Sequence, residues 1–209
     1  MGHAGSGLHG SRSLRPGDRP DLSRPVGECR LADGTSIRFR PIEPTDASAY
    51  ETMLCRCSPK SLYSRYERLI TATPREMAEE LCQHDPDCEL TVVAEISAET
   101  GAAIVGMAQL LSDPNHEAAE YAVLVADPWQ GQGLGGALTS FCLGIAHEWG
   151  IGRVIAEFLP DNMRMIRILE TRKFNLHRDS QEHVVSGQKV IGGAGRPTAI
   201  ELTQAKRRT

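Results

Sequence analysis

A glycine-rich turn between two apolar segments constrains this chain more than any other feature. AEYAVLVAD, residues 119–127, is apolar on both faces from Tyr121 to Ala126, as in a central buried strand. LGGALTSFCLGIAHEWG, residues 134–150, has the apolar spacing of a helix. The first turn of a helix has amides without internal partners, and its dipole favours an anion there. Because glycines let a ligand approach the backbone, we expect a phosphate site formed by Gln130, Gly131, Gln132, Gly133, Leu134, Gly135 and Gly136.

The same glycines are compatible with other interpretations. They could simply form a tight turn against a packed helix. The chain has no G-x-x-x-x-G-K-S/T sequence, which excludes a P-loop nucleotide hydrolase. Gly131, Gly133 and Gly136 match the dinucleotide-binding fingerprint, and Glu157 follows at about the expected distance of ~20 residues. However, residues 127–130 separate these glycines from the strand, and the chain after them is too short for a second nucleotide-binding half.

The composition is that of an ordinary globular protein. Of the 209 residues, 40% are hydrophobic and 24% are charged, and the formal net charge is −4. The small negative charge argues against a nucleic-acid partner, which requires an excess of Lys and Arg. No apolar run reaches the ~18 residues that cross a bilayer, so we expect no membrane partner.

Residues 1–26 are expected to form a disordered tail before a single domain at 27–206. The tail is rich in Gly, Ser, Arg and Pro and has no apolar segment of the signal-peptide type. The six cysteines form no C-x-x-C pair and have no His at ligand spacing, so we expect no metal site. Reduced thiols and a cytoplasmic location are the corresponding expectation.

The domain alternates between strand and helix patterns without an internal repeat. Asp33-Gly34 lies between two short strands and indicates a hairpin. Thr73 and Glu76 form a capping box, with Pro74 at the first helical position. The pattern predicts a mixed α/β fold. Further strands are expected at 90–96, 102–111, 119–127, 153–159, 183–191 and 198–203, and helices at about 46–56, 58–69, 74–82, 134–150 and 161–173.

Two segments resemble the acyl-CoA-binding elements of the GNAT superfamily of N-acyltransferases. AVLVADPWQGQGLGGAL is similar to the signature Q/R-x-x-G-x-G/A, with Gln130, Gly133 and Gly135 at its three defined positions. DNMRMIRILETRKF is similar to the second element, which commonly begins with Asn and ends in Gly-Phe. The resemblance covers residues 28–203. Within the superfamily, LADGTSIRFRPIEPTD, SPKSLYSRYERL, AEYAVLV and NMRMIRIL are most similar to the catalytic domain of bacterial Pat-type protein-lysine acetyltransferases.

The resemblance implies a fold and a co-substrate. The fold is a central, mixed, mostly antiparallel twisted sheet of about six to seven strands flanked by helices. Acetyl-CoA would lie between two splayed parallel strands of this sheet, with no metal. Besides the loop at 130–136, the resemblance implies cofactor contacts from Val123, Leu124, Val125 and Asn162. Judged from the residues, Asn162 is equally compatible with a helix cap beside Asp161.

Acetyl transfer to an amine needs a base, and Glu120 is the candidate. A lysine side chain has an ordinary pKa near ~10.4, so it must lose a proton at neutral pH. Period-two alternation places Glu120 on one strand face with Ala122 and Leu124. The resemblance implies that Glu120 is the general base and acts through water, whereas the pattern by itself is more typical of an exposed glutamate. The competing acids are Glu95, Glu117 and Glu157.

Two positions depart from the family pattern. Position 169 is Leu, where many members have a Tyr that protonates the leaving thiolate. A thiol pKa lies near ~8.5, so the thiolate can leave without full protonation, and we name no general acid. Lys173-Phe174 stands in place of Gly-Phe.

The expected function is transfer of an acetyl group from acetyl-CoA to a primary amine, by direct attack in a ternary complex. The resemblance implies a protein lysine as the acceptor, with acyl-CoA synthetases as the first candidates. A small-molecule amine acceptor and a non-catalytic acyl-CoA-binding sensor remain as alternatives, and the oligomeric state stays open. The surface that would dock a protein acceptor includes Arg56, Lys60, Tyr63, Arg65, Tyr66 and Arg68.

Overall fold

The computed structural model describes residues 27–66, 70–82, 88–98, 101–179 and 183–191. The expected tail at 1–26 and the expected strand at 198–203 lie outside the described residues, as does the end of the predicted domain. Within the described part of the chain, no helix has the length and apolar character needed to cross a membrane.

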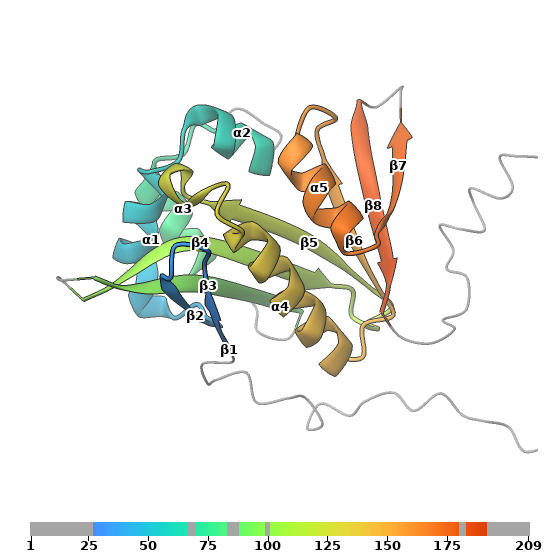
Figure 1. The fold of residues 1–209 in the computed structure, drawn as a ribbon, viewed down its shortest axis with the longest axis horizontal. Helices are drawn as coiled ribbons and strands as arrows, with labels where there is room; N and C mark the ends of the chain where they lie inside the picture. Colours follow the sequence, from blue (N-terminus) through green and yellow to red (C-terminus); the bar gives the residue numbers. More distant parts are fainter. Residues whose placement is uncertain (1–26, 67–69, 83–87, 99–100, 180–182, 192–209) are drawn as a thin grey trace, which may run out of the picture.

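An eight-stranded sheet forms the centre of the molecule, in the order β1-β2-β3-β4-β5-β6-β8-β7 (Figure 1). Neighbouring strands are antiparallel, except that β5 and β6 run parallel. The expected mixed, mostly antiparallel sheet is therefore confirmed. The strands are β1 Gly27–Arg30, β2 Ser36–Pro41, β3 Glu89–Ala98, β4 Gly101–Ser112, β5 Ala118–Val125, β6 Arg153–Phe158, β7 Asn175–Asp179 and β8 Val184–Val190.

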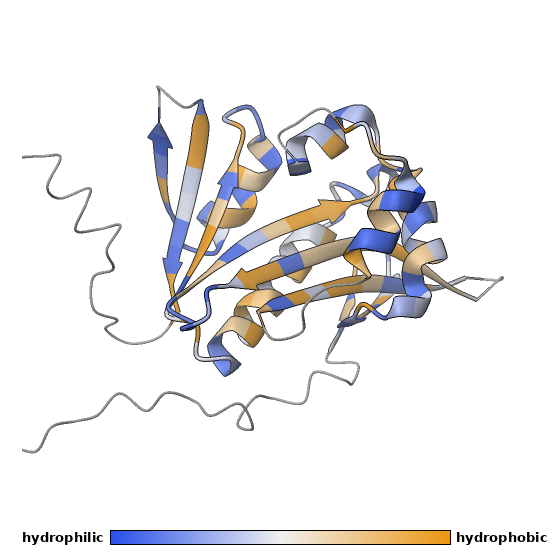
Figure 2. Cartoon of the chain, turned by 180° about the vertical axis from the view of Figure 1, so that it is seen from behind, coloured by the Kyte–Doolittle hydropathy of each residue, from blue (hydrophilic) through white to orange (hydrophobic). Residues whose placement is uncertain are grey.

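Helices cover both faces of the sheet and bury a separate core on each (Figures 1 and 2). The larger core lies under α4 and α5 and includes Leu138, Phe158 and Leu169. The smaller core lies under α1 and α3 and includes Met53, Met107 and Leu124. The helices are α1 Ala47–Leu54, α2 Pro59–Tyr66, α3 Pro74–Leu81, α4 Leu134–Glu148 and α5 Met163–Thr171, with short 3₁₀ turns η1 Pro44–Asp46 and η2 Asp127–Trp129.

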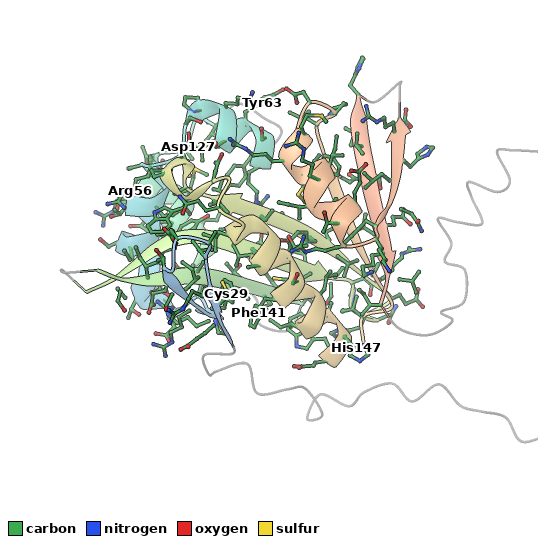
Figure 3. All side chains as sticks on the ribbon, viewed as in Figure 1. Cys29, Arg56, Tyr63, Asp127, Phe141 and His147 are labelled. Atoms are coloured by element: carbon green, nitrogen blue, oxygen red, sulfur yellow. The ribbon has the colours of Figure 1, made fainter. Side chains whose placement is uncertain are left out.

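Local sequence signals placed several of these elements correctly. The hairpin around Asp33-Gly34 joins β1 to β2, and Gly34 has a φ of 91°. The capping box at the start of α3 is present, because Thr73 Oγ1 accepts from the Glu76 amide and Glu76 accepts from the Thr73 amide. Phe141 of α4, labelled in Figure 3, stacks on Phe39 of β2 with ring centroids 5.1 Å apart, which packs α4 against the β1–β2 hairpin.

The strand β7 was not among the strands that the sequence pattern predicted, because this segment has no apolar pattern. Four of its five residues are exposed, and Leu176 is half-buried. An edge strand of this kind pairs through its backbone with β8 and buries little, so periodicity does not reveal it. Figure 2 shows β7 mostly in hydrophilic colour. The start of α5 also differs, since Asn162 rather than Asp161 is its N-cap.

The end of α5 explains the Lys173-Phe174 departure. Lys173 has a left-handed φ of 59°. The Lys173 amide donates to the Glu170 carbonyl at 2.9 Å, and the Phe174 amide donates to the Leu169 carbonyl at 3.0 Å. These two bonds define the helix-ending turn that usually contains glycine at its left-handed position. Lys173 therefore occupies a glycine position, and its side chain is exposed.

Replacing Lys173 with Gly should stabilise the protein. A non-glycine residue in the left-handed region costs about 1 kcal/mol or more, and part of this is returned through the greater freedom of glycine in the unfolded chain. We expect Lys173→Gly to raise the free energy of unfolding by about 0.5–1 kcal/mol in urea titrations. Lys173→Ala, which removes the side chain and keeps the strain, is the control and should give no comparable gain. An equal gain in both variants would show that the Lys173 side chain, not its backbone, is the destabilising element.

Candidate active site

The strands β5 and β6 are paired over a short stretch and then part. Their register includes three pairs, which join Ala118–Glu120 to Arg153–Ile155. Beyond this point β5 continues to Val125 along β4, while β6 continues to Phe158 along β8. Figure 1 shows the two strands diverging toward the ends that precede α4 and α5. Two strand edges with free backbone groups therefore face each other.

The backbone of Val123 faces this opening. The Ala126 amide donates to the Val105 carbonyl at 3.0 Å, which sets the hydrogen-bond alternation of the β4–β5 ladder. The alternation directs the main-chain groups of Leu124 toward β4 and those of Val123 and Val125 toward β6. Leu124 is buried opposite Met107 in the smaller core. Of the three predicted cofactor residues on β5, Val123 and Val125 thus present their backbone to the opening and Leu124 does not.

The glycine loop ends in a helix N-terminus without a cap. Gly133 is the N-cap of α4 with a φ of 93°, and no side chain caps the helix there. The first backbone hydrogen bond of α4 runs from the Ala137 amide to the Gly133 carbonyl. The amides of Leu134, Gly135 and Gly136 therefore have no partner within the helix. A Cβ added at Gly131 or Gly133 would meet no atom within 4 Å. The loop is thus open at the place where the sequence predicts a phosphate.

The last two glycines of the loop have a different role. A Cβ at Gly135 would lie 3.2 Å from Ile168 Cδ1, and one at Gly136 would lie 2.8 Å from Arg172 Nη2. These two positions permit the close packing of α4 against α5. Arg172 also donates to the Gly136 carbonyl and, at 3.0 Å, to Ser140 Oγ. Gly135 and Gly136 therefore serve the packing of the helix, whereas Gly131 and Gly133 have the left-handed φ of a tight turn and leave the loop open.

A buried chain of hydroxyl groups fixes α4 on β5. The Tyr121 hydroxyl lies 2.9 Å from Thr139 Oγ1, and Thr139 Oγ1 donates to the Gly135 carbonyl at 2.7 Å. Burial raises the pKa of Tyr121 well above its usual range, so this hydroxyl stays protonated. These hydrogen bonds therefore fix the first turn of α4 on the face of β5.

The side chain of Gln130 joins the loop to three other elements. Its Nε2 donates to the Val125 carbonyl at 2.8 Å and to Ser61 Oγ of α2 at 3.0 Å. Its Oε1 accepts from Arg164 of α5. Gln130 therefore supports the loop through its side chain, and its predicted contact with the cofactor stays a prediction. Gln132 is half-buried, and its Nε2 donates to the Pro128 carbonyl at 2.9 Å.

Asp127 completes this network between the loop and α2. Ser61 Oγ donates to Asp127 Oδ1 at 2.6 Å, and Figure 3 shows Asp127 below α2. Burial acts to raise the pKa of the Asp127 carboxyl, but hydrogen bonds from Ser61 and Ser58 and the charge of Arg164 outweigh it and leave that pKa lowered. The ionised carboxylate therefore holds α2 against the loop.

Glu120 occupies the point at which the two strands part. It belongs to the last β5–β6 pair, opposite Ile155, and its side chain is exposed. It shares a strand face with Leu124, as predicted, and this face looks toward the smaller core under α1 and α3. Among the residues that the structure describes, Glu120 has no hydrogen-bond or ion-pair partner. It is thus a carboxylate without a structural role at the opening.

The competing acids are placed differently. Glu95 accepts from Arg40 Nε at 2.7 Å, and the same Arg40 guanidinium makes two bonds to Asp46, so Glu95 belongs to a structural ion-pair network. Glu117 lies in the loop before β5. Glu157 lies two residues beyond Ile155 on β6, on the same face as Glu120 and across the opening. Glu157 is the one competitor that shares the site.

The two positions of the second acyl-CoA element that the sequence analysis singled out, Asn162 and Leu169, have structural roles. Asn162 Oδ1 accepts from the Met165 amide at 3.1 Å, so the capping interpretation is confirmed and a contact with the cofactor stays a prediction. Leu169 is fully buried in the larger core, where it packs toward Gly187. The position that often carries a Tyr in the family is thus an apolar core position in this chain.

The structure adds Gln109 and Arg65 to the site, which the sequence analysis had not combined. Gln109 is a buried polar residue in the apolar run of β4, and Arg65 Nη2 of α2 donates to its Oε1 at 2.6 Å. A glutamine within such a run is a visible signal, but its partner is 44 residues away. Arg65 and Tyr66 are half-buried rather than exposed as expected, whereas Arg56, Lys60 and Tyr63 are exposed and Arg68 lies outside the described residues. The described residues contain no group of three or more His, Cys, Asp or Glu that could hold a metal.

Comparison with known proteins identifies the family of this chain. The profile of the acetyltransferase (GNAT) family matches residues 53–174, which is more than half of the chain. The GNAT domain of S. lividans PAT is 26% identical, with a TM-score of 0.68 over 78% of this chain and 96% of that domain. This similarity confirms the predicted resemblance to the Pat-type catalytic domain.

Two more distant structures share the fold. One is yncA from Salmonella typhimurium, solved with acetyl-CoA; it is 18% identical with a TM-score of 0.64, over 78% of this chain and 98% of that one. The other is RimJ from Mycobacterium smegmatis, solved with CoA-disulfide; it is 18% identical with a TM-score of 0.63, over 90% of this chain and 98% of that one. From the matched profile, the splayed strands and the glycine loop together, the chain belongs to the GNAT family of acetyltransferases.

Proposed function

We propose that this protein transfers an acetyl group from acetyl-CoA to a primary amine, and that the amine is a lysine side chain of a folded protein. The observation that carries the proposal is Glu120, an exposed carboxylate at the point where β5 and β6 part, which has no structural partner among the described residues. A base at this position serves amine acylation, and neither a sensor module nor a dinucleotide enzyme requires it.

The loop and the strand edges fit the co-substrate in two places. The free amides of Leu134, Gly135 and Gly136, together with the open space at Gly131 and Gly133, suit a pyrophosphate. The backbone groups of Val123 and the amide of Val125, whose carbonyl already accepts from Gln130, suit the amides of a pantetheine arm lying between β5 and β6. The two distant relatives were solved with acetyl-CoA and with CoA-disulfide, which supports the same assignment.

In the proposed reaction each group of the chain has a single task. Acetyl-CoA supplies the acetyl group as an activated thioester. Glu120 accepts the proton of the incoming ammonium group, directly or through a water, so that a neutral amine attacks. The Val123 amide donates a hydrogen bond to the carbonyl oxygen on which negative charge develops. No group of the chain needs to protonate the sulfur, because a thiol pKa near ~8.5 makes the thiolate an adequate leaving group.

The lysine acceptor is supported by the similarity to the PAT domain and by the face on which Glu120 lies. This face is bordered by α2, whose outer side presents Lys60 and Tyr63 and whose preceding turn presents Arg56. Tyr and Arg side chains are enriched where proteins dock, because they combine apolar area with directional hydrogen bonds. Acyl-CoA synthetases are the first acceptors to test.

The open space at Gly131 and Gly133 predicts the effect of introducing a charged side chain at Gly133. In Gly133→Glu, the left-handed backbone is strained and the carboxylate competes with the pyrophosphate for the α4 amides, so acetyl-CoA binding should be lost. Gly144→Glu introduces the same side chain in the middle of α4, where a Cβ meets no atom within 4 Å, and should leave binding unchanged. Calorimetric titration with acetyl-CoA measures both. Normal affinity in a folded Gly133→Glu protein would remove the loop from the site.

The proposed role of Glu120 as the base predicts that its removal lowers turnover without weakening acetyl-CoA binding. Glu120→Gln keeps the size and removes the basicity, so kcat should fall by roughly 10²–10⁴ while acetyl-CoA affinity barely changes. The defect should shrink as the pH rises, because a larger share of the amine is then already neutral. Glu157→Gln is the matched control across the opening, and a larger defect in that variant would assign the base to Glu157.

The acceptor class is tested by comparing a folded protein with its own peptide. If the acceptor is a protein lysine, kcat/KM for the intact protein should exceed that for a short peptide with the same lysine by roughly tenfold or more, because remote contacts contribute binding energy. Free polyamines and amino acids are assayed beside them. If any free amine reacted faster than every protein tested, the acceptor would be a small amine rather than a protein lysine. A thermal shift with NAD(H) in place of acetyl-CoA would instead favour a dinucleotide enzyme.

A further inference from the structure

The guanidinium of Arg65 is held in a fixed orientation beside the proposed base. Arg65 Nη2 donates to Gln109 Oε1 at 2.6 Å, and the guanidinium carbon lies 4.9 Å from the ring centroid of Tyr66. Gln109 is 7% exposed, and its Nε2 donates in turn to Glu89 Oε1. Because Glu89 accepts from the amide nitrogen, Gln109 must present its oxygen to Arg65. The arginine is thus oriented by a buried amide rather than by an ion pair.

The strand register places Gln109, the hydrogen-bond partner of Arg65, one row from Glu120. Gln109 pairs with Ala122, and Leu111 pairs with Glu120, so Gln109 and Glu120 lie in adjacent cross-strand rows on one face of the sheet. Two residues along a strand span about 7 Å. The guanidinium that bonds Gln109 is therefore one row from the carboxylate, on the face that an acceptor amine must approach.

Arg65 has unused hydrogen-bonding capacity. Its Nε is buried and has no hydrogen-bond partner, and it makes no ion pair with a carboxylate of the described residues. By contrast, Arg40 binds both Asp46 and Glu95. Two other buried atoms without a partner, Tyr50 Oη and Thr91 Oγ1, lie on the same face of the sheet. The guanidinium has five N–H donors, and within the described residues only Nη2 has a hydrogen-bond partner, so donors remain for a ligand.

We propose that Arg65 binds a carboxylate that the acceptor carries close to its reacting amine. An ammonium group that approaches Glu120 also approaches the Arg65 guanidinium and is repelled by it. An acceptor with a neighbouring carboxylate replaces this repulsion by a charge-assisted hydrogen bond, for which the planar guanidinium is well suited. The same positive charge favours the neutral form of the attacking amine. Arg65 is thus a specificity-determining residue, and Gln109 is its positioning residue.

This inference rests on the proposed function and deepens it. The carboxylate can come from two sources, an acidic side chain beside an acceptor lysine or the α-carboxylate of a free amino acid. Both have the same chemistry, and matched acceptor pairs separate them. The first pair is a lysine peptide with Glu or Gln beside the lysine, and the second is free lysine and lysinamide.

The test measures kcat and KM for both pairs with the full chain. The wild type should favour the carboxylate member of at least one pair by about 10- to 100-fold in kcat/KM, mostly through KM. Arg65→Gln should abolish this preference, and Arg65→Lys, which keeps the charge, should retain part of it. Arg75→Gln is the matched control, since Arg75 is an exposed cation of α3 paired with Glu79, and the preference should be unchanged.

Two further measurements test the inference without relying on Arg65 variants. The wild-type preference should shrink as salt rises, because screening weakens the charge pair. Gln109→Leu should reduce the preference by releasing Arg65, with acetyl-CoA affinity unchanged.

The outcomes separate this inference from the proposed function. An equal loss for both members of each pair in Arg65→Gln would show a purely structural arginine and overturn the inference. A wild type that transfers acetyl groups without preferring either carboxylate would also overturn it while leaving the proposed function intact. The absence of transfer to any amine would overturn the proposed function and this inference together.

Discussion

The parting of β5 and β6 is the constraint on which the rest of the site depends. Three residue pairs hold the two strands together, and beyond them each strand keeps its hydrogen bonds to the neighbour on its other side. The sheet therefore remains continuous through β4–β5 and β6–β8 while one internal edge opens. The exposed main-chain groups at Val123 and Val125 need partners, and the Val125 carbonyl finds one in Gln130. The main-chain groups of β5 that find no such partner are available to a ligand.

Two chemically different faces meet at this opening. On the α4 side lies the loop with uncapped amides, fixed by the Tyr121–Thr139–Gly135 chain. On the other side lies Glu120, beside the polar row formed by Gln109 and Arg65. The short helix α2 contacts both, because Ser61 bonds Asp127 near the loop and Arg65 bonds Gln109 on the sheet. None of its residues is fully buried, and Leu62 packs only at the margin of the smaller core, so these hydrogen bonds help to determine the position of α2.

Local chemistry was readable from the sequence wherever a few neighbouring residues decide the structure. The Thr73–Glu76 capping box began α3 as predicted, and the glycines at 131 and 133 adopt the left-handed conformations that such a turn needs. β7 was missed, because an exposed edge strand is specified by its partner rather than by its own pattern. Asn162 could not be decided, since a cap and a ligand contact require the same residue type. Gly135 and Gly136 could not be distinguished from Gly131 and Gly133, because their role depends on α5.

By itself, the sequence determined the strand–glycine loop–helix unit, the candidate base and the family resemblance, because each of these is written in contiguous residues. The tertiary structure decided which glycines leave space and which permit packing, and it directed Leu124 toward β4 and Val123 toward the opening. It also separated the competing glutamates, because Glu95 pairs with Arg40 whereas Glu120 has no partner within the part of the chain that the structure describes. Arg65 and Gln109 became one unit only on folding, since they are 44 residues apart. Contacts of this kind depend on strand register and helix placement, which are set by the burial of the whole core rather than by any local segment.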